Sequence, residues 1–252
     1  MFNFCAKFYY VEDPEVKLVE LDGDETTWGG SMLGYFKVFD GAFRSVKLDF
    51  PQRQLLERIL PLWGSPHPEI FKAALRGFPD RVDDACAEYE RLLLSTDVFL
   101  SELYVFEGSK TFLDQRRRVG NFALGLVTGM HPKLLKEKVL PKLNLEGEFD
   151  FIRSAYDVLP TQSKPNPFLA LDIVGAAGVT VDQTVGVGDH KNDIHMFNNA
   201  GITSVATLTG VINTPELARR SDADYVISDL AHLKHVVNLA RLSGSTVYID
   251  RT

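Results

Sequence analysis

The sequence predicts an α/β fold, with a parallel β-sheet between layers of helices and a helical segment inserted after the first strand. Two patterns support this prediction. From residue 108 onward, short apolar segments typical of buried strands alternate with helical segments, and this order produces a parallel sheet with right-handed crossovers. Between residues 33 and 107, helical patterns follow one another and strand signals are sparse.

The composition is that of a globular protein, and it excludes several classes of function. Hydrophobic residues make up 45% of the 252 residues and charged residues 24%, as in ordinary soluble domains. The net charge of -7 argues against binding to nucleic acid or to an anionic membrane surface. Two cysteines are too few for a disulfide framework or a four-cysteine zinc site. The sequence shows no signal-peptide pattern and no apolar run of about 18 residues, so we expect a cytoplasmic protein.

The first expected strand, residues 16–21, runs directly into the turn Asp22-Gly23-Asp24. After the inserted helices, expected at 51–60, 68–75 and 82–94, the alternating pattern begins. Its expected strands are 122–127, 149–152, 184–187, 202–207 and 225–227, and its expected helices are 132–142, 167–177, 193–200 and 215–221. Because ligands of parallel sheets bind at the carboxyl ends of the strands, residues that follow these strands are candidates for a functional site.

Chemically active residues follow a strand or precede a helix in four places. They are Asp22 and Asp24 after the first strand, Thr128 with Gly129 and Met130 after the second, Lys164 before a helix, and Asp189 with Asp193 after a later strand. Each group alone has an ordinary structural explanation, because Asp favours turns and helix caps, and Thr-Gly and Lys-Pro are common at helix starts. All four groups in this order are hard to obtain by chance.

Together the four groups resemble the motifs of the haloacid dehalogenase superfamily of phosphohydrolases: Asp-x-Asp-x-Thr, then Thr, then Lys, then Gly-Asp-x-x-x-Asp. The long separation between the first two groups matches members whose helical cap is inserted after the first motif. The resemblance implies a three-layer Rossmann-like core, residues 1–32 and 108–252, with an α-helical cap at residues 33–107. It also implies a phosphatase similar to phosphoglycolate phosphatases, which acts on a small phosphorylated metabolite.

The resemblance implies a role for each motif residue. Asp22 is the nucleophile that forms an aspartyl-phosphate, and Asp24 is the general acid and base. Lys164 supplies the positive charge that stabilises the transferring phosphoryl group and binds phosphate. Thr128 and the backbone N–H groups of Gly129 and Met130 bind phosphate oxygens.

The resemblance also implies a bound Mg²⁺, because a cation lets an anionic phosphate approach an anionic nucleophile. Its oxygen ligands would be the carboxylates of Asp22 and Asp189 and the backbone carbonyl of Asp24, with water completing the octahedron. Asp193 would join through a water molecule or orient Asp189.

Two alternatives to a phosphatase stay open. A phosphomutase of the same superfamily is disfavoured, because residues 28–44 contain no His, whereas related mutases carry one shortly after the first motif. A non-catalytic phosphate-binding protein on the same fold is suggested by Glu25. This residue stands where many capped relatives have Gly, which accepts left-handed backbone angles more easily.

The remaining expectations concern partners and the chain ends. We expect no nucleic-acid and no membrane partner, and either a monomer or a homodimer. Residues 1–13 are expected to add an edge strand or hairpin, paired with residues 246–249 near the other terminus.

Overall fold

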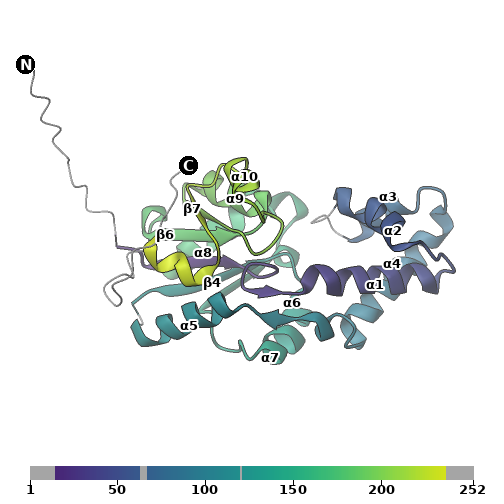
Figure 1. The fold of residues 1–252 in the computed structure, drawn as a ribbon, viewed down its shortest axis with the longest axis horizontal. Helices are drawn as coiled ribbons and strands as arrows, with labels where there is room; N and C mark the ends of the chain where they lie inside the picture. The colour runs from purple at the N-terminus through teal and green to yellow at the C-terminus, as the bar shows by residue number, and fades with distance from the viewer. Residues whose placement is uncertain (1–14, 63–66, 120, 237–252) are drawn as a thin grey trace, which may run out of the picture.

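A six-stranded parallel sheet forms the centre of the computed structural model, which describes residues 15–62, 67–119 and 121–236 (Figure 1). The strand order is β5-β4-β1-β6-β7-β8, and every neighbouring pair is parallel. The strands are β1 (Leu18–Asp22), β4 (Ala123–Thr128), β5 (Phe151–Ser154), β6 (Thr184–Gly188), β7 (Thr203–Thr207) and β8 (Tyr225–Ile227). The expected strands are therefore all present, with ends that differ by a few residues.

Helices cover both faces of this sheet, as the alternating side chains of β1 show. Leu18 packs with Val127 against α8 (Phe168–Ala177) and α9 (Lys191–Ala200) on one face. Val19 and Leu21 point to the other face, which packs against α5 (Glu107–Val119) and the 3-10 helix η8 (Leu230–His235). Period-two alternation requires this division. The predicted three-layer α/β class is confirmed.

Two further expected helices are present in the described part of the chain. The expected helix 132–142 is one continuous helical stretch that contains a π turn. Its parts are α6 (Pro132–Leu134), the π-helical η4 (Leu135–Val139) and α7 (Leu140–Leu143). The last expected helix is α10 (Pro215–Arg219).

The inserted helices α1 (Ser31–Ser45), α2 (Gln52–Ile59), α3 (His67–Ala74) and α4 (Val82–Ser95) lie together at one side of the sheet (Figure 1). At their junction with the sheet, β2 (Trp28–Gly29) pairs antiparallel with β3 (Tyr104–Val105). These two strands hold the start and the end of the insertion together. They are too short to leave a pattern in the sequence.

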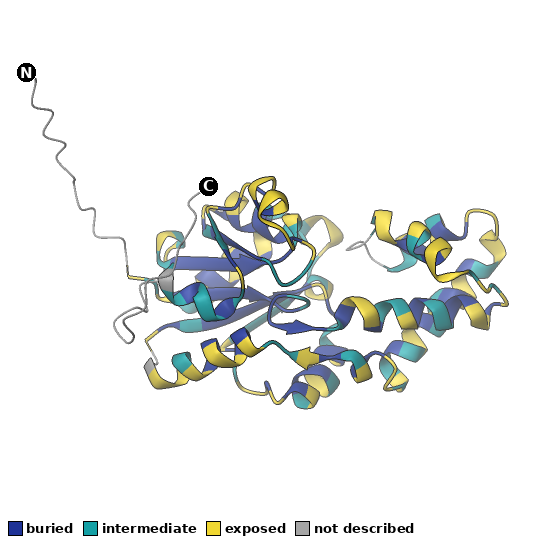
Figure 2. Ribbon diagram, in the orientation of Figure 1, coloured by how far each residue is buried: buried dark blue, intermediate teal, exposed yellow. Residues whose placement is uncertain are grey.

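The inserted helices pack around aromatic rings. Phe39 and Phe43 lie one turn apart on α1 and therefore share a face. They contact Phe71 of α3 at ring-centroid distances of 5.2 and 5.1 Å, and Phe39 lies 4.6 Å from Tyr89 of α4. Figure 2 shows the corresponding buried stripes on the inner sides of these helices.

Two expectations concern the chain ends and membranes. The pairing of residues 1–13 with residues 246–249 lies outside the described residues. Within the described part of the chain, no helix combines the length and the apolar character that a bilayer-spanning segment needs.

Candidate active site

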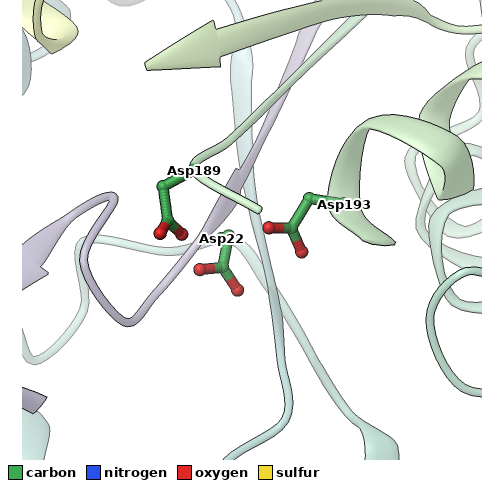
Figure 3. A group of neighbouring side chains, drawn as sticks. All are labelled: Asp22, Asp189 and Asp193. Carbon is green, nitrogen blue, oxygen red and sulfur yellow. The ribbon is translucent and has the colours of Figure 1, made fainter. Parts of the chain in front are cut away.

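Three aspartates meet at the carboxyl edge of the sheet. Asp22 is the last residue of β1, which lies between β4 and β6. Asp189 directly follows β6, and Asp193 lies in the first turn of α9. All three are buried, and one carboxylate oxygen from each lies within 4.8 Å of the others. Figure 3 shows the carboxylates pointing toward one another.

Lys164 reaches this cluster from the loop before α8. Its Nζ lies 2.5 Å from Asp22 Oδ1 and 2.7 Å from Asp193 Oδ1, and it donates to the carbonyl oxygen of Val127 at 2.9 Å. Burial alone would lower the pKa of Lys164, but the adjacent carboxylates of Asp193 and Asp22 raise it above its usual value. The ammonium is therefore charged, and it fixes the position of the Asp22 carboxylate.

The pKa values of Asp22 and Asp189 are raised, mainly because burial disfavours a charged carboxylate. Burial raises the pKa of Asp22 well above its usual value, although Lys164 opposes that effect. Burial and the nearby Asp193 raise the pKa of Asp189 to about 7, while hydrogen bonds from Val211 and Thr26 lower it. A divalent cation would offset the negative charge that burial and the neighbouring carboxylates disfavour, and carboxylate oxygens are the donors that Mg²⁺ prefers. The cluster therefore fits a magnesium ion.

Asp24 lies on the turn that follows β1, beside the inserted helices. Its Oδ1 accepts hydrogen bonds from Trp28 Nε1 at 2.9 Å and from Ser31 Oγ at 2.6 Å. Burial raises the pKa of Asp24, and these two hydrogen bonds partly oppose the rise. Its carboxylate is not one of the three that form the possible metal site. The expected role of its backbone carbonyl as a metal ligand stays a prediction.

The segment Thr128-Gly129-Met130 begins at the last residue of β4 and lies at the same edge, because Asp22 pairs in register with the preceding residue, Val127. Thr128 is fully buried, and its Oγ1 accepts a hydrogen bond from the Met130 N–H at 3.0 Å. The Met130 carbonyl in turn accepts from Ser154 Oγ at 2.7 Å. Neighbouring strands thus hold this segment next to Asp22.

Glu25 adopts the left-handed backbone conformation, with φ 58°. Its N–H donates to the carbonyl of Trp28 at 2.7 Å, which closes the turn after Asp24. The backbone geometry for which glycine is favoured is therefore present, and a glutamate occupies it.

Sequence reasoning missed two residues that contact Asp189 and one buried carboxylate on β1. Thr26 Oγ1 donates to Asp189 Oδ1 at 3.2 Å, and the Val211 N–H donates to Asp189 Oδ2 at 2.8 Å. Thr26 is part of the Asp-x-Asp-x-Thr motif, which was the available signal. Val211 carried none, because a backbone amide leaves no mark on the sequence. Glu20 of β1 is fully buried, and neither of its carboxylate oxygens has a partner among the described residues.

Comparison with known proteins gives relatives that are named as phosphatases. The pyrophosphatase PpaX of Halalkalibacterium halodurans is 30% identical over 181 residues, which cover 70% of this chain and 77% of the relative. A phosphoglycolate phosphatase of Pseudomonas putida is 30% identical over 183 residues, which cover 71% of this chain and 65% of that protein. The chain thus spans slightly less than two thirds of this second relative.

A solved structure and a family pattern agree with these relatives. The structure of a predicted phosphoglycolate phosphatase from Haemophilus somnus superimposes with a TM-score of 0.71 at 19% identity, covering 88% of this chain and 97% of that one. This likeness shows the fold. The pattern of the haloacid dehalogenase-like hydrolases matches residues 63–201. The predicted family and the predicted class of enzyme, a hydrolase of the phosphatase type, are confirmed, and the chain belongs to the haloacid dehalogenase-like hydrolase family.

Proposed function

We propose that this protein is a Mg²⁺-dependent phosphatase that hydrolyses a small phosphorylated metabolite through a phosphorylated aspartate. The observation that carries the proposal is the buried cluster in which Lys164 holds Asp22 beside Asp189 and Asp193. A nucleophilic carboxylate, a fixed ammonium and a site for a divalent cation are the groups that phosphoryl transfer requires.

In the first step, an oxygen of Asp22 attacks the phosphorus of the substrate, and the bond from phosphorus to the leaving alcohol breaks. Asp24 gives its proton to the leaving oxygen. In the second step, Asp24 accepts a proton from water, the water oxygen attacks the phosphorus, and the Asp22 carboxylate is released with inorganic phosphate. The burial that raises the pKa of Asp24 favours its protonated form for the first step.

The other motif residues would position the phosphoryl group. Asp22, Asp189 and the Asp24 carbonyl would hold Mg²⁺, with Asp193 joining through water, and the ion would supply positive charge at the phosphate. Asp193 also holds Lys164, and its Oδ2 accepts the backbone N–H of His190 at 3.1 Å. This double attachment supports a role in orienting the lysine.

Phosphate oxygens would bind to Thr128, to the N–H groups of Gly129 and Met130, and to Lys164. In the structure the Met130 N–H donates to Thr128 Oγ1. A bound phosphate would therefore compete with Thr128 for this amide.

We further propose that residues 33–107 act as a cap over a core of residues 1–32 and 108–252, and that the leaving group lies between Asp24 and α1. Ser31 of α1 donates to Asp24, and Tyr35 lies one turn further along the same helix face. The named relatives support a small phosphate ester as the substrate class. We propose that the protein is a cytoplasmic monomer or homodimer. We expect it to bind neither nucleic acid nor a membrane.

The test is the hydrolysis of p-nitrophenyl phosphate with Mg²⁺, with EDTA and with the variant Asp22→Asn. We expect EDTA to abolish turnover and Asp22→Asn to lower it by at least ~10³-fold, the scale of losing a nucleophile. Asp49→Asn, which changes an exposed carboxylate, is the matched control. Metal-independent turnover or a fully active Asp22→Asn variant would contradict the mechanism. Transfer of the phosphate to a second position on a sugar phosphate, instead of its release, would favour the phosphomutase.

A further inference from the structure

Glu25 touches the first inserted helix through its side chain. Its Oε1 accepts a hydrogen bond from the backbone N–H of Met32, in the first turn of α1, at 3.0 Å. The first N–H groups of a helix have no partner within the helix, and they carry a partial positive charge. The carboxylate of Glu25 thus ties the start of α1 to the turn that carries Asp24.

The backbone of Glu25 touches a different part of the molecule, the loop after β7. Its carbonyl oxygen accepts a hydrogen bond from Thr209 Oγ1 at 2.6 Å. Two residues further on, the Val211 N–H donates to Asp189 Oδ2 at 2.8 Å, and the Ile212 N–H donates to the Asp189 carbonyl at 2.7 Å. The loop 209–212 therefore contacts Glu25 at one end and Asp189 at the other.

Gly210 shows how closely these parts fit. A Cβ atom at this position would lie 2.0 Å from Asp189 Oδ2 and 2.7 Å from Glu25 Cβ. Such distances are shorter than van der Waals contact, so a side chain would not fit here and the loop backbone packs closely against both acidic residues. Glu25 and Asp189 are therefore connected through this loop by close packing as well as by hydrogen bonds.

A glutamate at position 25 carries costs that a glycine would avoid. The left-handed conformation is less favourable for a non-glycine residue, and the carboxylate adds negative charge next to Asp24 and Asp189. Its bond to the start of α1 offsets these costs. The Glu25 side chain therefore connects the turn to helix α1, a contact that formation of the turn does not require.

We propose that Glu25 is a positioning residue that couples the seating of helix α1 to the loop 209–212 and thereby to Asp189. Binding of a cation at Asp22, Asp189 and Asp193 fixes this loop, and through Glu25 it stabilises the first turn of α1 against the core. The inference rests on the magnesium site proposed above. It links the state of that site to the position of the inserted helices.

The test measures amide hydrogen exchange in the first turn of α1, with and without saturating Mg²⁺, after calorimetry has measured Mg²⁺ binding to each variant. In the wild type we expect Mg²⁺ to slow this exchange by about 5-fold, the factor of one helix cap. Glu25→Gly keeps the left-handed turn but removes the acceptor, so we expect no response to Mg²⁺. Glu25→Gln keeps an acceptor oxygen, so we expect the response to persist.

The response to Mg²⁺ separates coupling from simple helix capping, because loss of a cap alone would speed exchange equally with and without the ion. The matched control is Glu102→Gln, which removes the ion pair with Lys37 of α1 and should leave the response intact. A wild type that does not bind Mg²⁺ or does not respond to it would overturn the coupling. A Glu25→Gly variant that responds like the wild type would do the same. Loss of the response in Glu25→Gln would overturn the hydrogen-bonded link.

Kinetics gives a second readout and separates this inference from the proposed function. In Glu25→Gly, we expect the Mg²⁺ concentration for half-maximal hydrolysis of p-nitrophenyl phosphate to rise by about 5-fold. An unchanged concentration would contradict the coupling and leave the phosphatase proposal standing. A wild type with an exchange response but without turnover would contradict the phosphatase proposal and leave the coupling standing.

Discussion

The carboxyl edge of the sheet and the inserted helices bury different kinds of side chain. At the sheet edge, Asp22 and Asp193 are buried, and both carboxylates contact the partly buried ammonium of Lys164. In the inserted helices, the buried side chains are apolar and include aromatic rings such as Phe43 and Phe71, whose centroids lie 5.1 Å apart. Buried charges cost desolvation energy even when they are paired, whereas buried rings stabilise the fold.

This contrast separates the two tasks of the molecule. The sheet edge holds polar groups that are costly to bury and that we propose act in catalysis, and the strands determine their placement. The inserted helices supply apolar packing, and one cluster of buried side chains continues from them to the sheet. Substitutions in the two regions should therefore affect different measurements.

The largest expected loss of stability comes from Phe71→Ala. Phe71 is fully buried and contacts the rings of Phe39, Phe43 and Tyr89, so its removal should lower the free energy of unfolding by about 3–5 kcal/mol. Urea denaturation measures this value, and the exposed Phe78 provides the control Phe78→Ala. The turnover number of the folded Phe71→Ala protein should stay within about 3-fold of the wild type, about 0.6 kcal/mol in activation free energy. A collapse of turnover in the folded variant would show that the two regions are not separable.

The second-largest expected effect is a loss of turnover caused by a substitution at the sheet edge. Lys164→Ala removes the cation that contacts Asp22 and Asp193, and it should lower turnover of p-nitrophenyl phosphate by at least ~10²-fold at saturating Mg²⁺. Lys191→Ala, at an exposed lysine in the neighbouring α9, should have little effect. An unchanged rate in a folded Lys164→Ala protein would remove Lys164 from the mechanism.

The difference between the two regions also explains what the sequence could predict. The positions of the strands and the motif residues could be predicted from the sequence, because buried strands have apolar runs and the site residues lie at or just after their ends. Asp22, Asp189 and Asp193 do meet, since the carboxyl ends of parallel strands share one edge. The relative positions of the inserted helices left no comparable signal, because many apolar sequences satisfy the same packing.

Some features of the site depend on contacts that no local pattern encodes. The loop 209–212 reaches Asp189 and Glu25 through backbone groups and one hydroxyl. Helix α1 begins at Ser31, before the expected cap boundary at residue 33, because a hydrogen bond from Ser31 to Asp24 stabilises its start. Neither contact follows from sequence spacing alone, since each depends on how distant segments pack.

The smallest expected change in stability concerns Glu20, a buried carboxylate of the sheet. Unlike Asp22 and Asp193 at the sheet edge, it has no hydrogen-bond partner among the described residues. Its neighbours across the sheet are Gly125 and Gly186, and a Cβ at Gly125 would already lie 3.3 Å from Glu20 Cγ. Glu20→Leu replaces the carboxylate with an apolar group of similar size. We expect the free energy of unfolding at neutral pH to rise by about 1–3 kcal/mol, the cost of an unsatisfied buried polar group.

The pH dependence of this gain distinguishes a titrating carboxyl from a simple packing change. Burial raises the pKa of Glu20 well above its usual value of 4.5, although Lys164 opposes the rise. The folded protein therefore keeps a proton that the unfolded chain loses, so this group costs the wild type stability as the pH rises above about 4.5. The advantage of Glu20→Leu should then be larger at pH 8 than at pH 5, as measured by urea denaturation. Glu20→Gln, which stays polar but does not titrate, should show a smaller gain at neutral pH because its amide is also unsatisfied. A gain for Glu20→Leu that is equal at both pH values would mean that Glu20 does not titrate in this range, and its burial would then act through packing alone.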